Sequence, residues 1–294
     1  MKSNLLVSFS GGRTSAYIAW WLMKNKKDIY NMEFVFANTG KEREETLTFV
    51  NKCDKEFGLN IKWVEADIYL GERIGTKHKL TSYELASRNG EPFEMLIKKY
   101  GIPNQNAPHC TRELKLQPIK SYVRDVLKWD LYKTALGIRS DEPKRLDWEK
   151  QKKQNLLYFA ELFYVTKEDV NKFWSKQSFD LELKSYEGNC DLCYKKGLRK
   201  LMTILKDNPE LGYWWKEMEV KYEMFTPISR IEKSKPPYRF FRDNMTIDDI
   251  IEESKFPFSL AVDTSKKIND SRQIYLWDDY LDSNNGCTES CEIS

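Results

Sequence analysis

Long apolar runs, histidines and an excess of one charge are all scarce in this chain of 294 residues. No stretch approaches the roughly 18 apolar residues of a membrane-spanning helix, so we expect no membrane partner. The net charge of +3, from 48 basic and 45 acidic residues, is too small to argue for nucleic-acid binding by itself. The N-terminus carries no basic region followed by an apolar run and a cleavage site, so the sequence predicts a soluble, cytoplasmic protein.

Six cysteines accompany only two histidines. Because the cytosol keeps thiols reduced, these cysteines are predicted to be metal ligands or redox groups rather than disulfides. Cys53 falls in an amphipathic helical pattern with Val50 and Phe57, which predicts a core residue. The other five lie in polar, turn-like segments and are candidates for chemistry. His78 has no such context and is predicted to lie on the surface.

Apolar, β-prone runs alternate with helical patterns through the first two-thirds of the chain. This order is typical of an α/β fold with a Rossmann-like, mainly parallel sheet and helices on both faces. Strands are predicted at residues 5–9, 33–37, 61–66, 133–138 and 156–159, and helices at 15–26, 44–57, 114–127 and 167–177. Residues 69–109 are interpreted as an insertion without strands, with a helix or two that cover the site. Further helices at 198–205, 213–222 and 246–253 predict a helical C-terminal region.

A glycine turn joins the first predicted strand to the first predicted helix. Its residues are Ser10-Gly11-Gly12-Arg13-Thr14-Ser15, preceded by Leu5-Leu6-Val7-Ser8-Phe9. Such a turn presents backbone N–H groups and the positive end of a helix dipole, which predicts a site for phosphate or sulfate. It lacks the lysine and the spacing of the Walker motif.

This turn resembles the S-G-G-x-[DT]-S loop of the PP-loop ATP pyrophosphatases and of the sulfonucleotide (APS/PAPS) reductases. The resemblance implies an adenine nucleotide alpha hydrolase-like fold and contacts to ATP, APS or PAPS from Ser8 and from residues 10–15. The second predicted strand ends in Asn38-Thr39-Gly40, followed by Glu44-Glu45-Thr46, and resembles F-x-[DN]-T-G-x-x-x-x-E-T-x-x-F-V of the same reductases. Asn38, Thr39 and Gly40 are therefore predicted to bind the base or ribose.

Two arginines follow a later predicted strand, in Gly137-Ile138-Arg139-Ser140-Asp141-Glu142-Pro143-Lys144-Arg145. The segment resembles the G-[LI]-R-x-x-[ED]-S-x-x-R loop of the reductases. Arginine forks suit a bidentate grip on phosphate or sulfate. Gly137, Arg139 and Arg145 are therefore predicted to bind the anion, with Arg13 as a third arginine.

Cysteines recur in two separate segments, at His109-Cys110 and at Cys190-Asp191-Leu192-Cys193. A C-x-x-C turn directs two thiolates to one point, as zinc and iron–sulfur clusters require. The first segment resembles C-C-x-x-R-K-x-x-P-L of the reductases, with His109 in place of the first cysteine. The resemblance implies a [4Fe–4S] cluster on Cys110, Cys190 and Cys193, with Lys115 near the substrate. A structural zinc with His109 as fourth ligand and a redox dithiol are the alternatives.

Cys287 and Cys291 stand near the end of the chain in a polar segment. In assimilatory PAPS reductases, a C-terminal cysteine in a Glu-Cys-Gly-x-His context attacks sulfur and is resolved by thioredoxin. The two cysteines have a similar terminal position without that motif. With Lys115, they are the predicted catalytic residues.

The leading hypothesis is a PAPS reductase-like enzyme that reduces a sulfonucleotide to sulfite, with a thioredoxin-like reductant. The second is an ATP pyrophosphatase and sulfurtransferase that acts in thiolation of tRNA or DNA. The third is a non-catalytic, zinc-stabilised nucleotide-binding module. In each case residues 1–200 are the nucleotide-binding domain with the insertion at 69–109, and residues 201–294 are the helical region with a flexible tail. A homodimer is compatible with all three.

Overall fold

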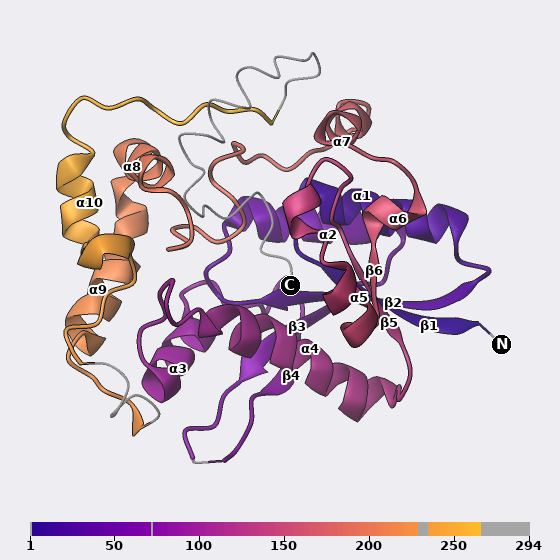
Figure 1. Cartoon of the computed structure of the whole chain (residues 1–294), viewed down its shortest axis with the longest axis horizontal. Coiled ribbons are helices and arrows are strands. Elements are labelled where there is room, and N and C mark those ends of the chain that lie inside the picture. The colour runs from indigo at the N-terminus through magenta and orange to yellow at the C-terminus, as the bar shows by residue number, and fades with distance from the viewer. Residues whose placement is uncertain (1, 72, 229–234, 266–294) are drawn as a thin grey trace.

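The computed structural model describes residues 2–71, 73–228 and 235–265, and its centre is a six-stranded sheet (Figure 1). The strand order is β4-β3-β2-β1-β5-β6. Neighbouring strands are parallel, except that the edge strand β4 pairs antiparallel with β3. The strands are β1 Ser3–Phe9, β2 Tyr30–Asn38, β3 Lys62–Asp67, β4 Lys77–Thr81, β5 Lys133–Leu136 and β6 Leu156–Tyr158. All five predicted strands are present, and the predicted α/β class is confirmed.

Helices cover both faces of this sheet. Leu5 and Val7 of β1 pack against the helices at residues 13–25, 44–57 and 167–174 on one face, whereas Leu6 packs against the helix at residues 117–122 on the other. Alternate side chains of a strand point to opposite faces, so the single apolar run of β1 serves both layers. The helices are α1 Arg13–Asn25, α2 Glu44–Phe57, α4 Gln117–Tyr122, α5 Trp148–Gln154, α6 Phe159–Leu162 and α7 Lys167–Trp174. Helix α4 continues π-helical turns at Thr111–Leu116 and is followed by another at Val123–Leu127.

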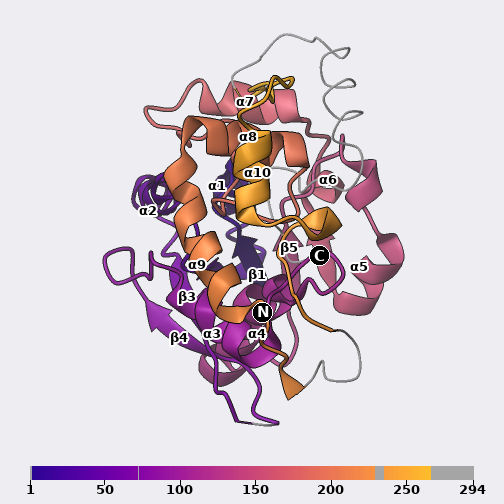
Figure 2. The same ribbon diagram turned by 90° about the vertical axis from the view of Figure 1, so that its left-hand side faces the viewer.

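A second hydrophobic core lies among the remaining helices (Figure 2). These are α3 Glu91–Tyr100, α8 Leu198–Asp207, α9 Gly212–Tyr222 and α10 Ile247–Glu253. Trp215, Phe240 and Ile250 are fully buried there. The helical C-terminal region is therefore present, whereas the proposed domain boundary at residue 200 stays a prediction. None of the helices in the described ranges is long and apolar enough to cross a membrane.

The insertion at residues 69–109 differs from its prediction, because it contains β4. This strand was hidden by its charged side chains, and exposed lysines are common on edge strands. His78 of β4 is half-buried rather than on the surface, and its Nδ1 lies 2.8 Å from Oγ of Ser121. Burial lowers the pKa of His78.

Cys53 of α2 is a core residue, as predicted. Its side chain is fully buried in the core that α1 and α2 share with the sheet. Burial raises the pKa of the thiol, as expected for an unreactive cysteine.

Candidate functional site

The loop between β1 and α1 has a conformation that requires glycine. Gly11 has a φ of +83°. A Cβ atom on Gly11 would lie 2.6 Å from Cγ2 of Thr46 and 3.2 Å from Cε2 of Phe36. Oγ of Ser15 donates to the carbonyl of Gly12 at 2.8 Å and closes the loop. Backbone strain and packing thus both select glycine at position 11.

The amides at the start of α1 point to an anion site. Gly12 is the N-cap residue, and no side chain in the described ranges caps it. Within those ranges, the backbone N–H groups of Gly11, Gly12, Arg13 and Thr14 donate no hydrogen bond to another protein group. Unsatisfied N–H groups at the positive end of a helix dipole suit phosphate or sulfate. The geometry is compatible with an anion at this position, and anion binding stays a prediction; Ser8 and Ser10 lie directly before these amides.

The guanidinium group of Arg13 already forms hydrogen bonds with other groups of the protein. Its Nε and Nη2 each donate to the carboxylate of Asp180 at 2.6 Å. The same guanidinium donates to the carbonyls of Leu181 at 3.0 Å and Ser265 at 3.1 Å. In this arrangement Arg13 ties the first turn of α1 to two distant segments. Anion binding by Arg13 stays a prediction and would require the ion pair with Asp180 to open.

Arg139 connects the loop after β5 to the glycine loop. Its Nη1 donates to Oγ1 of Thr14 at 3.1 Å, and its Nε donates to Oδ1 of Asp141 at 2.8 Å. Arg145 pairs with Glu142, which also accepts the backbone N–H of Arg139. The structure therefore places Arg139 and Arg145 in one cluster at the start of α1. Gly137 is buried directly after β5.

The side chain of Asn38 forms hydrogen bonds with other groups of the protein. Its Nδ2 donates to Oε1 of Glu65 at 2.7 Å and to the carbonyl of Ser87 at 2.8 Å. Thr39 donates from its N–H and from Oγ1 to Oε2 of Glu42, both at 2.8 Å. These side chains hold the end of β2 in place. A base or ribose would have to contact the backbone there, so nucleotide binding by this segment stays a prediction.

The segment with the C-x-x-C pair lies against the glycine loop. Nδ2 of Asn189 donates to the carbonyl of Ser10 at 2.6 Å. The carbonyl of Asn189 accepts the N–H of Arg43 at 2.8 Å, and Cys190 pairs as a β-bridge with Glu42. Sequence reasoning missed Asn189 and Glu42. Their only signal was their position next to motif residues, because polar side chains in turns are common.

Glu42 brings two of the predicted site residues together. Its Oε1 lies 3.9 Å from Nζ of Lys115 and accepts from Sγ of Cys190 at 3.6 Å. Glu42 and Lys115 are both buried. The structure therefore places Lys115 beside the C-x-x-C segment. Its catalytic role stays a prediction.

Cys110 lies beside the other end of that segment. Its Sγ is 3.0 Å from the hydroxyl of Tyr194, the residue after Cys193. Nζ of Lys195 donates to Oγ1 of Thr111 at 3.2 Å. Two cysteine segments that are about 80 residues apart in the chain thus become neighbours.

The predicted metal ligands are neighbours without forming a ligand set. Nε2 of His109 lies 3.0 Å from the carbonyl of Gly101. Among the described residues, no three His, Cys, Asp or Glu side chains are grouped so that they could hold a metal ion. The described side chains alone therefore do not complete a site for a [4Fe–4S] cluster or a zinc ion. Both cofactors stay predictions. Cys287 and Cys291 lie outside the described residues.

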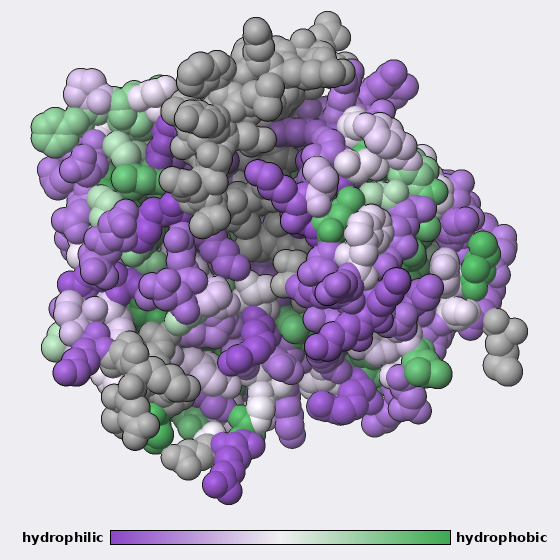
Figure 3. Space-filling model, in the orientation of Figure 1, coloured by the Kyte–Doolittle hydropathy of each residue, from purple (hydrophilic) through white to green (hydrophobic). Residues whose placement is uncertain are grey.

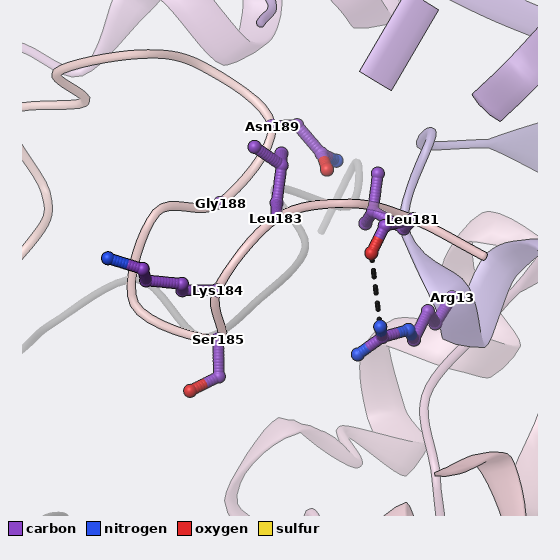
Figure 4. Close-up of a pocket in the computed structure, with 8 residues that line it drawn as sticks. Arg13, Leu181, Leu183, Lys184, Ser185, Gly188 and Asn189 are labelled. Atoms are coloured by element: carbon purple, nitrogen blue, oxygen red, sulfur yellow. Dashed lines mark hydrogen bonds between the residues drawn. The ribbon is translucent and has the colours of Figure 1, made fainter. Parts of the chain in front are cut away.

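A cavity opens beside the start of α1 (Figure 4). Gly12 and Arg13 form one wall, and the chain from Leu181 to Asn189 forms the other. The first residues of α1 therefore border a small open space. Lining residues are Gly12, Arg13, Leu181, Leu183, Lys184, Ser185, Gly188 and Asn189.

Arg43 lies between this loop region and α2. Burial alone would lower the pKa of its guanidinium, but the hydrogen-bonded carboxylate of Glu45 and the nearby charge of Glu187 raise it. Arg43 is therefore a permanent positive charge next to the C-x-x-C segment. Its position in the sequence did not indicate this role.

Comparisons with known proteins agree with this architecture. The phosphoadenosine phosphosulfate reductase domain family matches residues 4–182, which is more than half of the chain. The uncharacterized nin region protein ORF290 of Escherichia phage lambda is 31% identical over 297 residues, covering 98% of this chain and 94% of that protein. The uncharacterized protein MJ0066 of Methanocaldococcus jannaschii is 24% identical over 239 residues, covering 76% of this chain and 42% of that protein. With the glycine loop, the parallel sheet and the arginine loop in place, this chain belongs to the phosphoadenosine phosphosulfate reductase domain family of PP-loop nucleotide-binding proteins.

Proposed function

We propose that the chain is a sulfonucleotide reductase, which binds APS or PAPS and releases sulfite. The observation that carries the proposal is the uncapped start of α1, where amides without a partner in the described ranges border a small cavity and Arg139 contacts Thr14. Membership of the PAPS reductase domain family supports the same substrate class.

The nucleotide would be held by the backbone amides at the start of α1 and by two arginines. Each arginine would exchange its carboxylate partner for a phosphate or sulfate group. Arg139 now bonds Asp141, and Arg145 bonds Glu142. A phosphate or sulfate group could replace these carboxylates, because guanidinium groups bind either anion through paired N–H bonds. Lys115 would contribute a further positive charge from the neighbouring C-x-x-C region.

The chemistry would need a cysteine thiolate, for which Cys287 and Cys291 remain the candidates. The thiolate would attack the sulfur of the phosphosulfate, form an S–S bond and break the bond between sulfur and the phosphate oxygen. The adenosine phosphate would leave with that electron pair. A thiol reductant of the thioredoxin class would then attack the cysteine sulfur, release sulfite and leave a disulfide.

A second candidate is an ATP pyrophosphatase that serves sulfur transfer to tRNA or DNA. It is favoured by the uncapped start of α1, whose amides suit the phosphate groups of ATP as well as those of a sulfonucleotide. A carbonyl oxygen of the acceptor would attack the α-phosphorus and displace pyrophosphate. A sulfur nucleophile would then displace AMP.

Product analysis separates these functions. The full chain would be incubated with PAPS or APS plus dithiothreitol, and separately with ATP plus an RNA or DNA acceptor. Sulfite release that is lost in Arg139→Ala, but retained in the exposed control Arg124→Ala, supports the reductase. Pyrophosphate release from ATP without sulfite formation would replace it by the second function. Nucleotide binding without turnover would leave a non-catalytic nucleotide-binding module.

The tail cysteines need separate variants. Cys287→Ser and Cys291→Ser should each be assayed for sulfite release. Full activity in both single variants and in the double variant would remove the tail from the mechanism.

A further inference from the structure

The hairpin that connects β3 to β4 projects from the molecule at the lower edge of the view in Figure 1. Its loop begins at the carboxyl end of β3, because β3 and β4 pair from Asp67↔Lys77 to Trp63↔Thr81. The glycine loop after β1 and the arginine loop after β5 also leave the carboxyl ends of parallel strands. The hairpin therefore rises from the same edge of the sheet as the candidate nucleotide site.

Hydrogen bonds to side chains hold the backbone of this hairpin in place. Nζ of Lys99, on α3, donates to the backbone carbonyls of Tyr69 and Ile74, and so clamps both sides of the loop. The hydroxyl of Tyr69 donates to Oδ2 of Asp67 at 2.6 Å. Lys99 thus links helix α3 to the backbone of the hairpin loop.

Apolar side chains near the hairpin tip are exposed. Tyr69 is 42% exposed, Leu70 is 56% exposed and Ile74 is 45% exposed. Several large apolar side chains together on a projecting loop are typical of an interaction site. On this face of the molecule, apolar side chains lie among hydrophilic ones in the lower part of the view (Figure 3).

Basic side chains flank these apolar residues. Arg73, Lys77 and Lys79 are exposed, and in the described ranges none of them pairs with a carboxylate. Nζ of Lys77 lies 5.9 Å from the centre of the Tyr69 ring. In the sequence, residues 67–81 contain these three basic residues against two acidic residues, Asp67 and Glu72. The charged side chains of the hairpin are therefore mostly basic.

We propose that this hairpin is a nucleic-acid-binding arm. Arg73, Lys77 and Lys79 contact the phosphate backbone, which attracts clustered cations regardless of sequence. The ring of Tyr69 stacks on a base, and Leu70 and Ile74 insert at a groove or base step, as apolar wedges do. The bound polynucleotide lies along the carboxyl edge of the sheet. This inference goes beyond the reaction proposed above and does not depend on it.

Binding of labelled oligonucleotides by fluorescence anisotropy tests the arm. The full chain would be titrated with single-stranded DNA, duplex DNA and an RNA hairpin from 50 to 200 mM salt. The variant R73E/K77E/K79E is compared with K24E/K52E/K55E, which carries the same charge change on exposed residues of α1 and α2. Loss of three phosphate contacts should weaken binding by roughly tenfold or more and lower the salt slope by about 2 to 3. Leu70→Ala should weaken binding without changing that slope.

Three results would overturn the proposal. The first is no binding to any of the three probes at 50 mM salt. The second is an equal loss of affinity in the two triple variants, which would indicate diffuse electrostatic attraction. The third is a change of oligomeric state in R73E/K77E/K79E with unchanged oligonucleotide affinity, which would make the hairpin a contact between copies of the chain. Unfolding curves and nucleotide binding should match the wild type in both variants, so failure of the arm is distinguishable from failure of the nucleotide site.

Discussion

Replacing Gly11 by alanine should both destabilise the protein and weaken nucleotide binding. The positive φ of +83° costs a residue with a Cβ about 1–2 kcal/mol. The new Cβ would also lie 2.6 Å from Cγ2 of Thr46, which is fully buried and cannot move away freely. Overpacking of this kind costs about 1–3 kcal/mol. The expected loss of unfolding free energy is therefore about 2–5 kcal/mol, a large share of the stability of a typical domain.

Two companion variants separate backbone strain from the steric clash. Gly58 has a similar φ of +62°, but a Cβ there would meet nothing within 4 Å. Gly58→Ala should therefore cost only the strain, about 1–2 kcal/mol. Thr46→Ser removes the clashing methyl group and keeps the hydroxyl. In that background Gly11→Ala should cost the strain of about 1–2 kcal/mol plus a smaller term from the remaining 3.2 Å approach to Cε2 of Phe36.

Urea unfolding of the four proteins in the Gly11/Thr46 cycle, with Gly58→Ala as control, measures these terms. Calorimetric titration with an adenine nucleotide measures the effect on binding, because the displaced loop carries the free amides. Equal losses for Gly11→Ala in the wild-type and Thr46→Ser backgrounds would refute the packing argument. Unchanged nucleotide affinity in a folded Gly11→Ala protein would refute the assignment of the loop as the anion site.

Three further substitutions have defined outcomes. Burial raises the pKa of Glu219 to about 7, so the folded state retains this proton and loses stability as pH rises from 4.5 to above 7. Glu219→Gln should remove about 3 kcal/mol of that pH dependence in urea unfolding, whereas the exposed control Glu217→Gln should leave it unchanged. Arg13→Lys should lower the unfolding free energy by about 1–2 kcal/mol, because lysine cannot bind the carboxylate of Asp180 through two donors. If the variant loses nucleotide affinity and keeps its unfolding free energy, Arg13 is an anion ligand instead. Arg139→Ala should weaken nucleotide binding by roughly 10- to 100-fold in calorimetry, and an unchanged affinity would exclude it from the site.

The elements that depend on local pattern could be predicted from the sequence. The apolar run before Ser10 and the helical spacing after it determine β1 and α1, and the alternation of side-chain direction explains why the continuously buried β1 serves two layers. The edge strand β4 was missed because its lysines hide the alternation. Strand prediction from apolar periodicity fails where one face and one edge are open to solvent.

The connections within the site could not be predicted, because they depend on the three-dimensional arrangement. Asp180 is 167 residues from Arg13 in the chain, and Asn189 is 179 residues from Ser10. No local pattern indicates that a carboxylate will occupy an arginine of the glycine loop. The sequence motif predicted that Arg13 binds the ligand, whereas in the structure Arg13 joins the start of α1 to the segments that contain Asp180 and Ser265.

The bond from Asn189 to the carbonyl of Ser10 complicates any test of the predicted metal ligands. Cys190 is the next residue, so Cys190→Ser could alter the glycine loop through the backbone without any metal being involved. Asn189→Ala separates the two effects, because it removes the bond and leaves every thiol in place. It should weaken nucleotide binding by roughly fivefold, the equivalent of one hydrogen bond of about 1 kcal/mol, without changing iron, sulfide or zinc content. A loss of metal in Asn189→Ala would mean that the loop and the cysteines form one cooperative unit, and ligand assignments would then require spectroscopy rather than substitution alone.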